Sequence, residues 1–321
     1  MYTLTIGAEE AGRKLDRYLM KRFPAVPKSF LYKALRTNKI KVNGRKPADL
    51  NSVLQENDVL SLYWTEEQWN AFQPAAGEKK APAAADLPEV EILYEDANIL
   101  VLNKPVGMLS QKDHTGEISL TEVGRAMLAR RGEHSFGQGF QPGVCSRLDR
   151  NTAGIVVMPK NLRAAQAMQE LMIEKKLKKY YTAIVEGAVP WTQKTLDGYW
   201  KKDHKTNQVQ IFHKPVSDSR PVQCECRRMA VRDDISWLEV RLITGKSHQI
   251  RAQLAEAGFP LLGDAKYGRG SGGGQMLCAS RLVFPECPEP LQALNGREIT
   301  APLPPAMAAL GQPKNNQSMG E

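Results

Sequence analysis

The sequence has few cysteines and no long apolar segment. Its five cysteines are scattered along 321 residues, and only Cys224 and Cys226 lie close together. A single residue between two cysteines suits neither a zinc knuckle nor a redox motif. No apolar run approaches the length that spans a membrane, and the first residues carry no basic-then-apolar export signal. We therefore expect a cytoplasmic protein with reduced thiols and no membrane contact.

The sequence also has no metal-ligand spacing and no glycine-rich motif that would hold a phosphate. We therefore predict neither a metal nor a cofactor. Acidic residues are outnumbered, because 44 Lys and Arg face 35 Asp and Glu, which gives a net charge of +9 and a pI near 9.2. This balance indicates a polyanionic partner, and nucleic acid is the partner that we expect. The length predicts two domains rather than one, and the hydrophobic fraction of 42% is typical of a soluble globular protein. We expect a monomer.

Most of the excess charge lies near the N-terminus. Residues 12–46 contain twelve Lys or Arg and one acid, Asp16. Apolar residues recur at helical spacing in 15–19 and again in 31–35, with Pro24 and Pro27 between the two predicted helices and Ser29 as the predicted cap of the second. Such a charge excess is too one-sided for an ordinary solvated helix face, so we expect the segment to bind phosphates.

A hairpin follows these helices, because Asn43-Gly44 lies between short apolar stretches in Ile40–Lys46. Residues 1–64 resemble the S4-type RNA-binding domain in three pieces, which are Arg13–Leu19, Lys28-Ser29 and Ile40–Gly44. The resemblance implies binding to structured RNA. The candidate RNA contacts in this domain are Arg13, Lys14, Arg17, Lys28, Ser29, Lys33, Arg36, Lys41, Asn43 and Arg45.

Residues 65–88 are rich in Ala and Pro and poor in large apolar groups, which predicts a flexible linker. Trp69 and Phe72 are its large apolar residues and could dock on either neighbour. A second domain is expected over 89–309, followed by a disordered tail at 310–321. Its predicted elements are strands at 90–94, 99–102, 155–158, 178–187, 223–230 and 236–242 and helices at 119–131 and 161–177.

Asp149 lies between Arg147 and Arg150, directly before the apolar run Ile155–Met158. Two interpretations stay open from this stretch alone. The carboxylate could sit at the mouth of a pocket, or it could cap an ordinary turn with both arginines in water. Lys104 ends an earlier apolar strand, where it could either neutralise a phosphate or simply face solvent.

Two further segments carry candidate site residues. In Lys178–Gly187 the neighbouring Tyr180 and Tyr181 must point to opposite faces of a strand, so one could reach a pocket while the other packs. Downstream, Ser247 is predicted to cap a helix that Gly258 ends. Arg251 falls in its first turn, where the helix dipole disfavours a cation. We therefore infer a fixed anionic partner for Arg251.

Taken together, residues 90–305 resemble the RluA-type family of RNA pseudouridine synthases. The motifs occur in the family order, as Lys104–Gly107, Arg147–Asp149, Lys179–Ala183, Gly245–Arg251 and Gly263–Gly268. The resemblance implies that Asp149 is the catalytic carboxylate, that Tyr181 stacks on the target base and that Arg251 pairs with Asp149. Tyr181 is chosen over Tyr180 because its distance to Gly187 matches the family pattern. Arg147 resembles the arginine that fills the gap left by the flipped uridine.

The implied reaction converts uridine to pseudouridine in RNA, with large-subunit ribosomal RNA as the expected substrate. Breaking the bond from ribose to nitrogen builds positive charge on the sugar, which a carboxylate can stabilise or attack. The uridine must first be flipped out of the folded RNA and stacked on an aromatic ring. A buried Asp149 without a partner would take up a proton, and Arg251 would favour its charged form.

The chain departs from the family pattern at Ser146, Ala153, Lys246 and Gln253. We expect these changes at RNA contacts, where they would alter the target rather than the reaction. Two other classes of function stay open. One is a non-catalytic ribosome-assembly factor that retains the fold, and the other is a nucleoside or glycan hydrolase, which would need a second carboxylate beside Asp149.

The predicted fold class is α+β. A small S4-like domain comes first, followed by a mixed α/β domain on a largely antiparallel sheet with a central active-site cleft.

Overall fold

The computed structural model describes residues 1–7, 10–73, 87–133, 140–203, 206–270 and 274–311. The chain divides into two units: residues 1–87 group with 125–143 and 159–166, and the remaining residues form the second unit. Most of the predicted linker (74–86) and of the predicted tail (312–321) lies outside the described residues.

The N-terminal part of the first unit is a small helix-and-sheet module. Its elements are β1 (Tyr2–Thr5), α1 (Leu15–Arg22), α2 (Lys28–Arg36), β2 (Ile40–Val42), β3 (Val59–Leu62) and α3 (Glu66–Phe72). The two predicted helices are confirmed, and their periodic apolar residues face one buried cluster. The strands form an antiparallel sheet in the order β1-β3-β2.

Two details of this module differ from the prediction. Ser29 does not cap α2, because the helix already begins at Lys28 and its N-cap residue is Pro27, whose side chain cannot accept a hydrogen bond. The chain also continues as α3 where a linker was predicted to begin. Thr65 and Gln68 form a capping box at its start, and Trp69 stacks on Tyr2 with ring centroids 3.8 Å apart. The ordered module therefore extends to Phe72.

The predicted Asn-Gly turn is present. Asn43 and Gly44 have φ angles of 52° and 75°, and Val42 and Arg45 exchange two backbone hydrogen bonds of 2.8 and 3.0 Å. Positive φ at both central residues is what a type I′ turn requires, and Asn and Gly tolerate it best. The main partner of β2 is β3 rather than the stretch that directly follows the turn.

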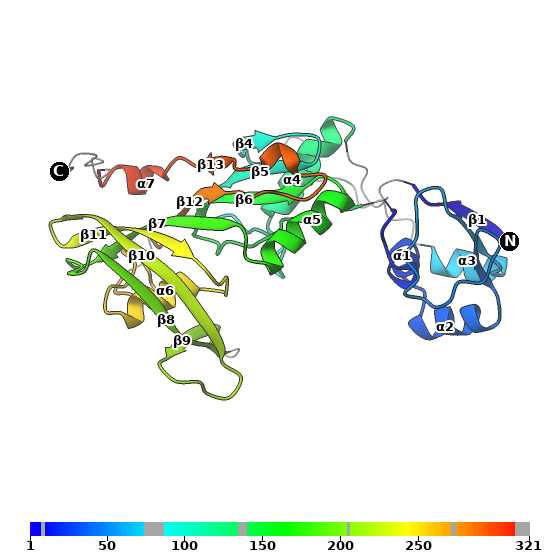
Figure 1. The fold of residues 1–321 in the computed structure, drawn as a ribbon, viewed down its shortest axis with the longest axis horizontal. Coiled ribbons are helices and arrows are strands. Elements are labelled where there is room, and N and C mark those ends of the chain that lie inside the picture. Colours follow the sequence, from blue (N-terminus) through cyan, green and yellow to red (C-terminus); the bar gives the residue numbers. More distant parts are fainter. Residues whose placement is uncertain (8–9, 74–86, 134–139, 204–205, 271–273, 312–321) are drawn as a thin grey trace. The chain divides into compact units, whose positions relative to one another are not determined.

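The second unit is built on a ten-stranded sheet in the order β4-β5-β6-β12-β7-β11-β10-β8-β9, with β13 beside β12 (Figure 1). The strands are β4 (Ile92–Glu95), β5 (Ile99–Lys104), β6 (Ala153–Pro159), β7 (Lys178–Glu186), β8 (Gln193–Asp203), β9 (Gln208–Phe212), β10 (Arg220–Arg232), β11 (Ile235–Leu242), β12 (Leu277–Val283) and β13 (Glu298–Thr300). Most pairs are antiparallel, whereas β6 and β12 run parallel. The mixed α/β domain with a largely antiparallel sheet is thus confirmed.

The remaining elements are α4 (Leu120–Arg130), α5 (Leu162–Ile173), α6 (Gln249–Glu256), η2 (Gln292–Leu294) and α7 (Pro305–Ala308). At α6 the residue before the helix is His248, which has a left-handed φ of 54° and makes no side-chain cap, so the predicted cap at Ser247 is wrong. Gln249 closes this turn instead, because its Oε1 accepts the backbone N–H of Lys246 at 3.1 Å. None of the helices in the described ranges has the length and apolar character to cross a membrane.

Gly154 permits the close approach of β6 and β12. Its φ is 109°, and a Cβ at this position would lie 2.2 Å from the carbonyl oxygen of Ala279. Any other residue would push the two strands apart at the point where the Asp149 loop enters β6. The position of that loop therefore depends on a glycine in the motif itself.

Candidate active site

Asp149 and Arg251 meet in the second unit, although they come from distant parts of the chain. Asp149 lies in the loop before β6, and Arg251 lies in the first turn of α6. Nη1 of Arg251 donates a hydrogen bond to Oδ2 of Asp149 at 3.0 Å, so the predicted contact is present. Arg251 is only 8% exposed, whereas Asp149 keeps access to solvent. One oxygen of the carboxylate is therefore fixed while the group still faces an opening.

A second carboxylate holds the same guanidinium. Asp264 is fully buried and accepts hydrogen bonds from Nε and Nη2 of Arg251 at 2.7 and 2.8 Å. Its Oδ1 also accepts the backbone N–H groups of Lys266 and Tyr267. Burial raises the pKa of Asp264, but the hydrogen bonds and charge of Arg251 lower it further, so the net shift is downward. The anionic partner inferred for Arg251 from the helix dipole is thus two carboxylates.

Asp264 had no predicted role. It belongs to the Gly263–Gly268 motif, which supported the family resemblance without naming a site residue. A count of hydrogen-bond donors could have indicated a second acid, because a buried guanidinium has five N–H donors and one carboxylate cannot accept from all of them. For Arg251, burial lowers the pKa, and the hydrogen bonds and charge of Asp264, with a smaller contribution from Asp149, raise it above its usual value.

His248 and Tyr267 border the carboxylate and were also missed. Nε2 of His248 lies 4.0 Å from Oδ2 of Asp149, and its Nδ1 lies 2.9 Å from the hydroxyl of Tyr267. The same hydroxyl accepts the backbone N–H of Val209 on β9 at 2.9 Å. Burial lowers the pKa of His248, Asp149 opposes this shift, and nearby cations including Arg251 add to it. Through the hydroxyl of Tyr267, His248 thus connects the β8–β9 hairpin with the site.

Lys104 contradicts both of its predicted roles. It is fully buried, so it is neither a solvated lysine nor a phosphate contact. Its Nζ donates hydrogen bonds of 2.8 Å to the carbonyl oxygens of Pro105, Met108 and Arg150. Burial lowers its pKa to about 7, whereas Asp149 and the three carbonyl acceptors favour the charged form. Lys104 therefore ties two loops together next to Asp149.

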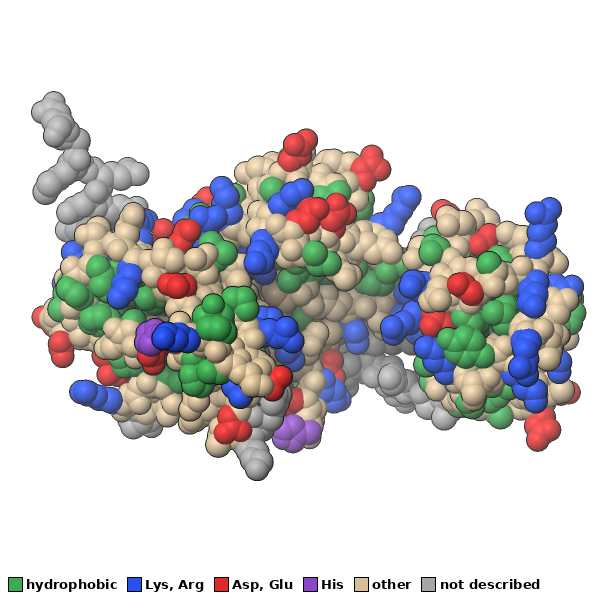
Figure 2. All heavy atoms as spheres, turned by 60° about the horizontal axis from the view of Figure 1, so that its bottom comes forward, with side chains coloured by type: hydrophobic (Ala, Val, Ile, Leu, Met, Phe, Trp, Pro, Cys, Tyr) green, Lys and Arg blue, Asp and Glu red, His purple; other side chains and the backbone are tan. Residues whose placement is uncertain are grey.

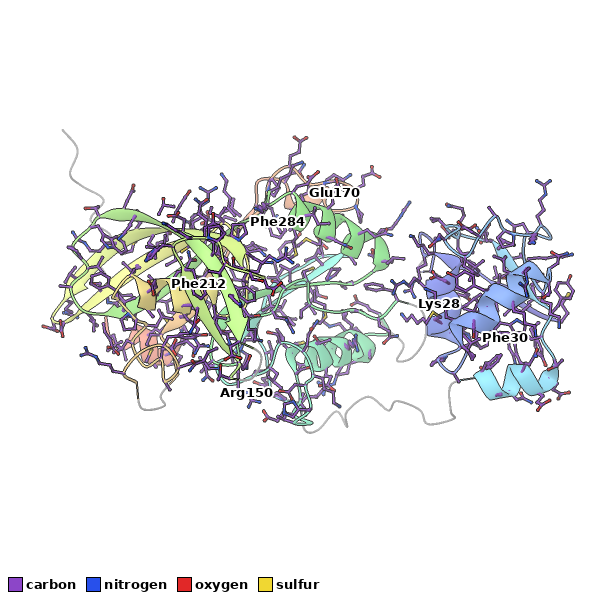
Figure 3. All side chains as sticks on the ribbon, turned by 90° about the horizontal axis from the view of Figure 1, so that it is seen from below. Lys28, Phe30, Arg150, Glu170, Phe212 and Phe284 are labelled. Atoms are coloured by element: carbon purple, nitrogen blue, oxygen red, sulfur yellow. The ribbon has the colours of Figure 1, made fainter. Side chains whose placement is uncertain are left out.

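The two arginines that flank Asp149 do not enclose it. Both are exposed, and Arg150, which is labelled in Figure 3, forms a bidentate ion pair with Glu117, with Nη1 to Oε2 at 2.8 Å. The cation that holds Asp149 is therefore Arg251 of α6 and neither of its sequence neighbours. The role predicted for Arg147 stays a prediction.

Tyr181 on β7 is 8% exposed, and Tyr180 is partly exposed beneath the guanidinium of Arg281, whose Cζ is 3.7 Å from the ring centroid. Burial raises the pKa of the Tyr181 hydroxyl above its usual range, and the charge of Asp149 adds to this shift. The ring of Tyr181 is therefore neutral and lies within electrostatic range of the carboxylate.

A cavity of about 270 Å³ opens beside Arg251. Its polar wall includes Asn151, Gln208, Lys266 and Gln275. In the described part of the chain, no group of three or more His, Cys, Asp and Glu side chains is placed to hold a metal ion. The arrangement offers a fixed carboxylate, a buried ring and polar groups beside them.

Most of the predicted contacts in the N-terminal module lie on its surface, where Figure 2 shows many Lys and Arg side chains. Lys14, Arg17, Lys28, Ser29, Lys33, Arg36 and Arg45 are exposed, and Arg13 and Lys41 are partly exposed. Asn43 is exposed as well, and its side chain donates to Asp58 at 2.7 Å and accepts the N–H of Val59 at 2.8 Å. Both polar atoms therefore help to hold the turn, and the RNA contact of Asn43 stays a prediction.

The four departures from the family pattern divide into two kinds. Ala153 and Gln253 are buried, and Gln253 donates to the carbonyl of Leu196 at 2.8 Å while it accepts from Gln249 at 2.9 Å. Ala153 and Gln253 therefore pack in the protein interior. The expectation that all four positions contact RNA is wrong for these two. Ser146 and Lys246 retain solvent access.

The family model for RNA pseudouridylate synthase matches residues 98–256. Ribosomal large subunit pseudouridine synthase C of Haemophilus ducreyi is 30% identical over 273 residues, which cover 82% of this chain and 78% of that protein. Its namesake in Salmonella typhimurium is 31% identical over 270 residues, which cover 83% and 79%. An uncharacterized RNA pseudouridine synthase of Mycoplasma genitalium is 28% identical over 87% of each chain.

Among solved structures, human RNA Pseudouridylate Synthase Domain Containing 4 shares the fold with a TM-score of 0.54 at 21% identity, over 68% of this chain and 90% of that one. The described sheet, the matching family model and the 30% identical relatives agree. The chain belongs to the RluA-type family of RNA pseudouridine synthases and is an RNA pseudouridine synthase.

Proposed function

We propose that the protein converts specific uridines of large-subunit ribosomal RNA to pseudouridine through the carboxylate of Asp149. The observation that carries this proposal is the position of Asp149, which is held by Arg251 at 3.0 Å and lies within electrostatic range of the buried ring of Tyr181. The names of the relatives support the substrate class, because two of them are called ribosomal large subunit enzymes.

The reaction places a distinct demand on each group. The bond between C1′ and N1 of uridine breaks and leaves positive charge on the ribose, which the carboxylate of Asp149 stabilises or captures as a covalent bond. The released base rotates, a bond forms between C1′ and C5, the C5 proton leaves, and N1 gains a proton. Atoms and electrons balance within the nucleotide, so neither an oxidant nor water is consumed.

The other residues hold the components in place. Tyr181 provides the surface on which the flipped base stacks, since a uridine inside folded RNA is out of reach. Arg251 orients Asp149, and Asp264 in turn fixes Arg251. The guanidinium is held on two sides, which leaves it little freedom to turn away while the sugar reacts.

In this proposal the N-terminal module is an S4-like RNA-binding domain. Its helices α1 and α2 present exposed cations that include Arg17, Lys33 and Arg36. Phosphate contacts of this kind supply affinity without sequence information, so they would hold the RNA while the second unit selects the uridine.

The function is tested by mapping pseudouridines in large-subunit ribosomal RNA from cells with and without the gene. We expect at least one pseudouridine to disappear on deletion and to return when the wild-type gene is restored. A complete set of large-subunit pseudouridines in the deletion strain would refute the proposed substrate.

A further inference from the structure

A second cavity borders Tyr181 and is lined within the second unit by residues of α5, β6, β7 and β12. Its wall is mostly apolar and includes Ile155, Val157, Met168 and Met172. Tyr181 and Lys179 reach it from β7, two residues apart on one strand. Residues at this spacing leave the same face of a strand, roughly 7 Å apart along it.

Lys179 is the unexplained polar group in this cavity. The structure gives its Nζ no hydrogen-bond or ion-pair partner among the described residues. Burial lowers the pKa of Lys179, and the nearby Cys145 thiol acts in the opposite direction. The side chain of Lys179 is partly exposed, so its amine can be reached from the cavity. The other cation of the wall, Arg281, is already held by Glu239 at 2.7 Å.

The surroundings of Lys179 indicate what kind of acceptor it would take. A phosphate would have to lose its hydration against Met168, Met172 and Val157, which is costly for an anion. A neutral aromatic base has no such cost, and its carbonyl oxygens accept hydrogen bonds from either an ammonium or an amine. A base stacked on Tyr181 would extend its edge along β7 toward Lys179.

We propose that Lys179 donates a hydrogen bond to the 4-keto oxygen of the flipped uracil and thereby selects uridine over cytidine. This inference rests on the proposed function, in which Tyr181 stacks on the target base. Cytosine has an amino group where uracil has this oxygen, so two donors would face each other and the base would be rejected. A pocket that pairs with one polar group discriminates strongly against an analogue that lacks it.

The test combines a protein change with a substrate change. Lys179→Met removes the donor and keeps the length of the side chain, and Lys178→Met, at an exposed neighbouring position, is the matched control. The substrate is an RNA fragment with uridine, 4-thiouridine or 2-thiouridine at the mapped position, and product formation is followed by mass spectrometry. Sulfur is a weaker acceptor than oxygen, so each thio base weakens one carbonyl contact.

We expect 4-thiouridine to lower kcat/KM of the wild-type protein by about 10- to 100-fold, the range for one hydrogen bond to a charged group. Lys179→Met should lose a similar factor on uridine and show no further loss on 4-thiouridine. Lys178→Met should behave as the wild type. Lys179→Gln, which retains an N–H donor, should keep part of the sensitivity to 4-thiouridine and serves if the Met variant does not fold.

Three results would overturn the assignment of Lys179. The first is unchanged activity of Lys179→Met on uridine, and the second is an equal loss of activity with 4-thiouridine in the wild type and the variant. The third is a loss that depends on Lys179 only when the base is 2-thiouridine, or only when the target phosphate is replaced by a methylphosphonate. All three require a wild-type protein that forms pseudouridine. A wild-type protein that forms none would instead overturn the proposed function, so the two failures are distinguishable.

Discussion

Nη1 of Arg251 donates a 3.0 Å hydrogen bond to Oδ2 of Asp149, 102 positions earlier in the chain. The same guanidinium gives Nε and Nη2 to Asp264, so its plane is fixed before the contact with Asp149 is considered. Because the guanidinium group is planar, fixing one of its edges also fixes the direction in which its remaining N–H groups point. Asp264 therefore determines where Arg251 can hold the carboxylate.

Asp264→Asn should lower both stability and activity. The change leaves a buried guanidinium without its main counter-charge and turns an N–H donor toward it, which costs about 3–5 kcal/mol in the free energy of unfolding. Because Arg251 is then free to turn, kcat should fall more than KM rises. Chemical denaturation and steady-state kinetics provide the two readouts. The exposed Asp218→Asn is the control and should stay within about 0.5 kcal/mol of wild type. A wild-type kcat in a folded Asp264→Asn protein would contradict this role.

The sequence was sufficient to predict the Asp149–Arg251 contact but not the third member of the cluster. A cation in the first turn of a helix predicts an anion nearby, and the family motif identified one. Asp264 follows Gly263 in a short loop with no periodic pattern, and only folding brings that loop beneath α6. The position of Arg251 in its helix thus predicted that an anion lies nearby, and only the tertiary structure identifies Asp264 as one of the two carboxylates.

Lys104 illustrates the opposite case, in which local reasoning was wrong. A lysine at the end of an apolar strand is usually solvated, but here the chain closes two loops over it and supplies three carbonyl acceptors. Those acceptors come from residues 105, 108 and 150, and the last of them is far away in the sequence. Strand and helix positions were largely predictable from periodicity, whereas such loop contacts depend on the complete fold.

Lys104→Met should destabilise the second unit. Methionine has a similar length but leaves the carbonyl oxygens of Pro105, Met108 and Arg150 without their donor, so we expect a loss of about 2–5 kcal/mol in the free energy of unfolding. Lys214→Met, at an exposed position, is the matched control and should change little. Urea denaturation checks both, and equal midpoints for the two variants would show that the three hydrogen bonds contribute no net stability.

His248 should titrate below its usual pKa of about 6.5, which NMR of the ring protons in the full chain can follow. Burial disfavours the imidazolium, Arg251, Lys266 and Lys202 add to this effect, and Asp149 opposes it. Asp149→Asn should therefore lower the pKa of His248 further. An upward shift in that variant would contradict the placement of the two groups.

The lowered pKa of His248 also gives the sign of a stability effect. Below about pH 6.5 the unfolded chain takes up a proton that the folded protein resists, so this group reduces stability as the pH falls from 6.5 to the folded pKa. His248→Gln, which cannot titrate, should show a smaller loss of stability over that interval than the wild type. Denaturation at several pH values measures the difference.

The basic module should contribute affinity rather than chemistry. Lys33→Glu combined with Arg36→Glu reverses two exposed charges on α2, so RNA binding should weaken. The slope of log affinity against log salt concentration should decrease by the equivalent of about two phosphate contacts. KM should rise while kcat stays near the wild-type value. Reversal of the exposed Lys175 and Lys176 is the control, and an equal effect there would show that the module has no special part in RNA binding.

The most direct test of the account is single-turnover pseudouridine formation by Asp149→Asn, with RNA binding measured on the same preparation. Asparagine keeps the size of the side chain and removes the charge that meets the sugar, so we expect no pseudouridine by mass spectrometry and an RNA affinity close to that of the wild type. Pseudouridine formed at the wild-type rate by this variant would show that the carboxylate of Asp149 does not carry the reaction.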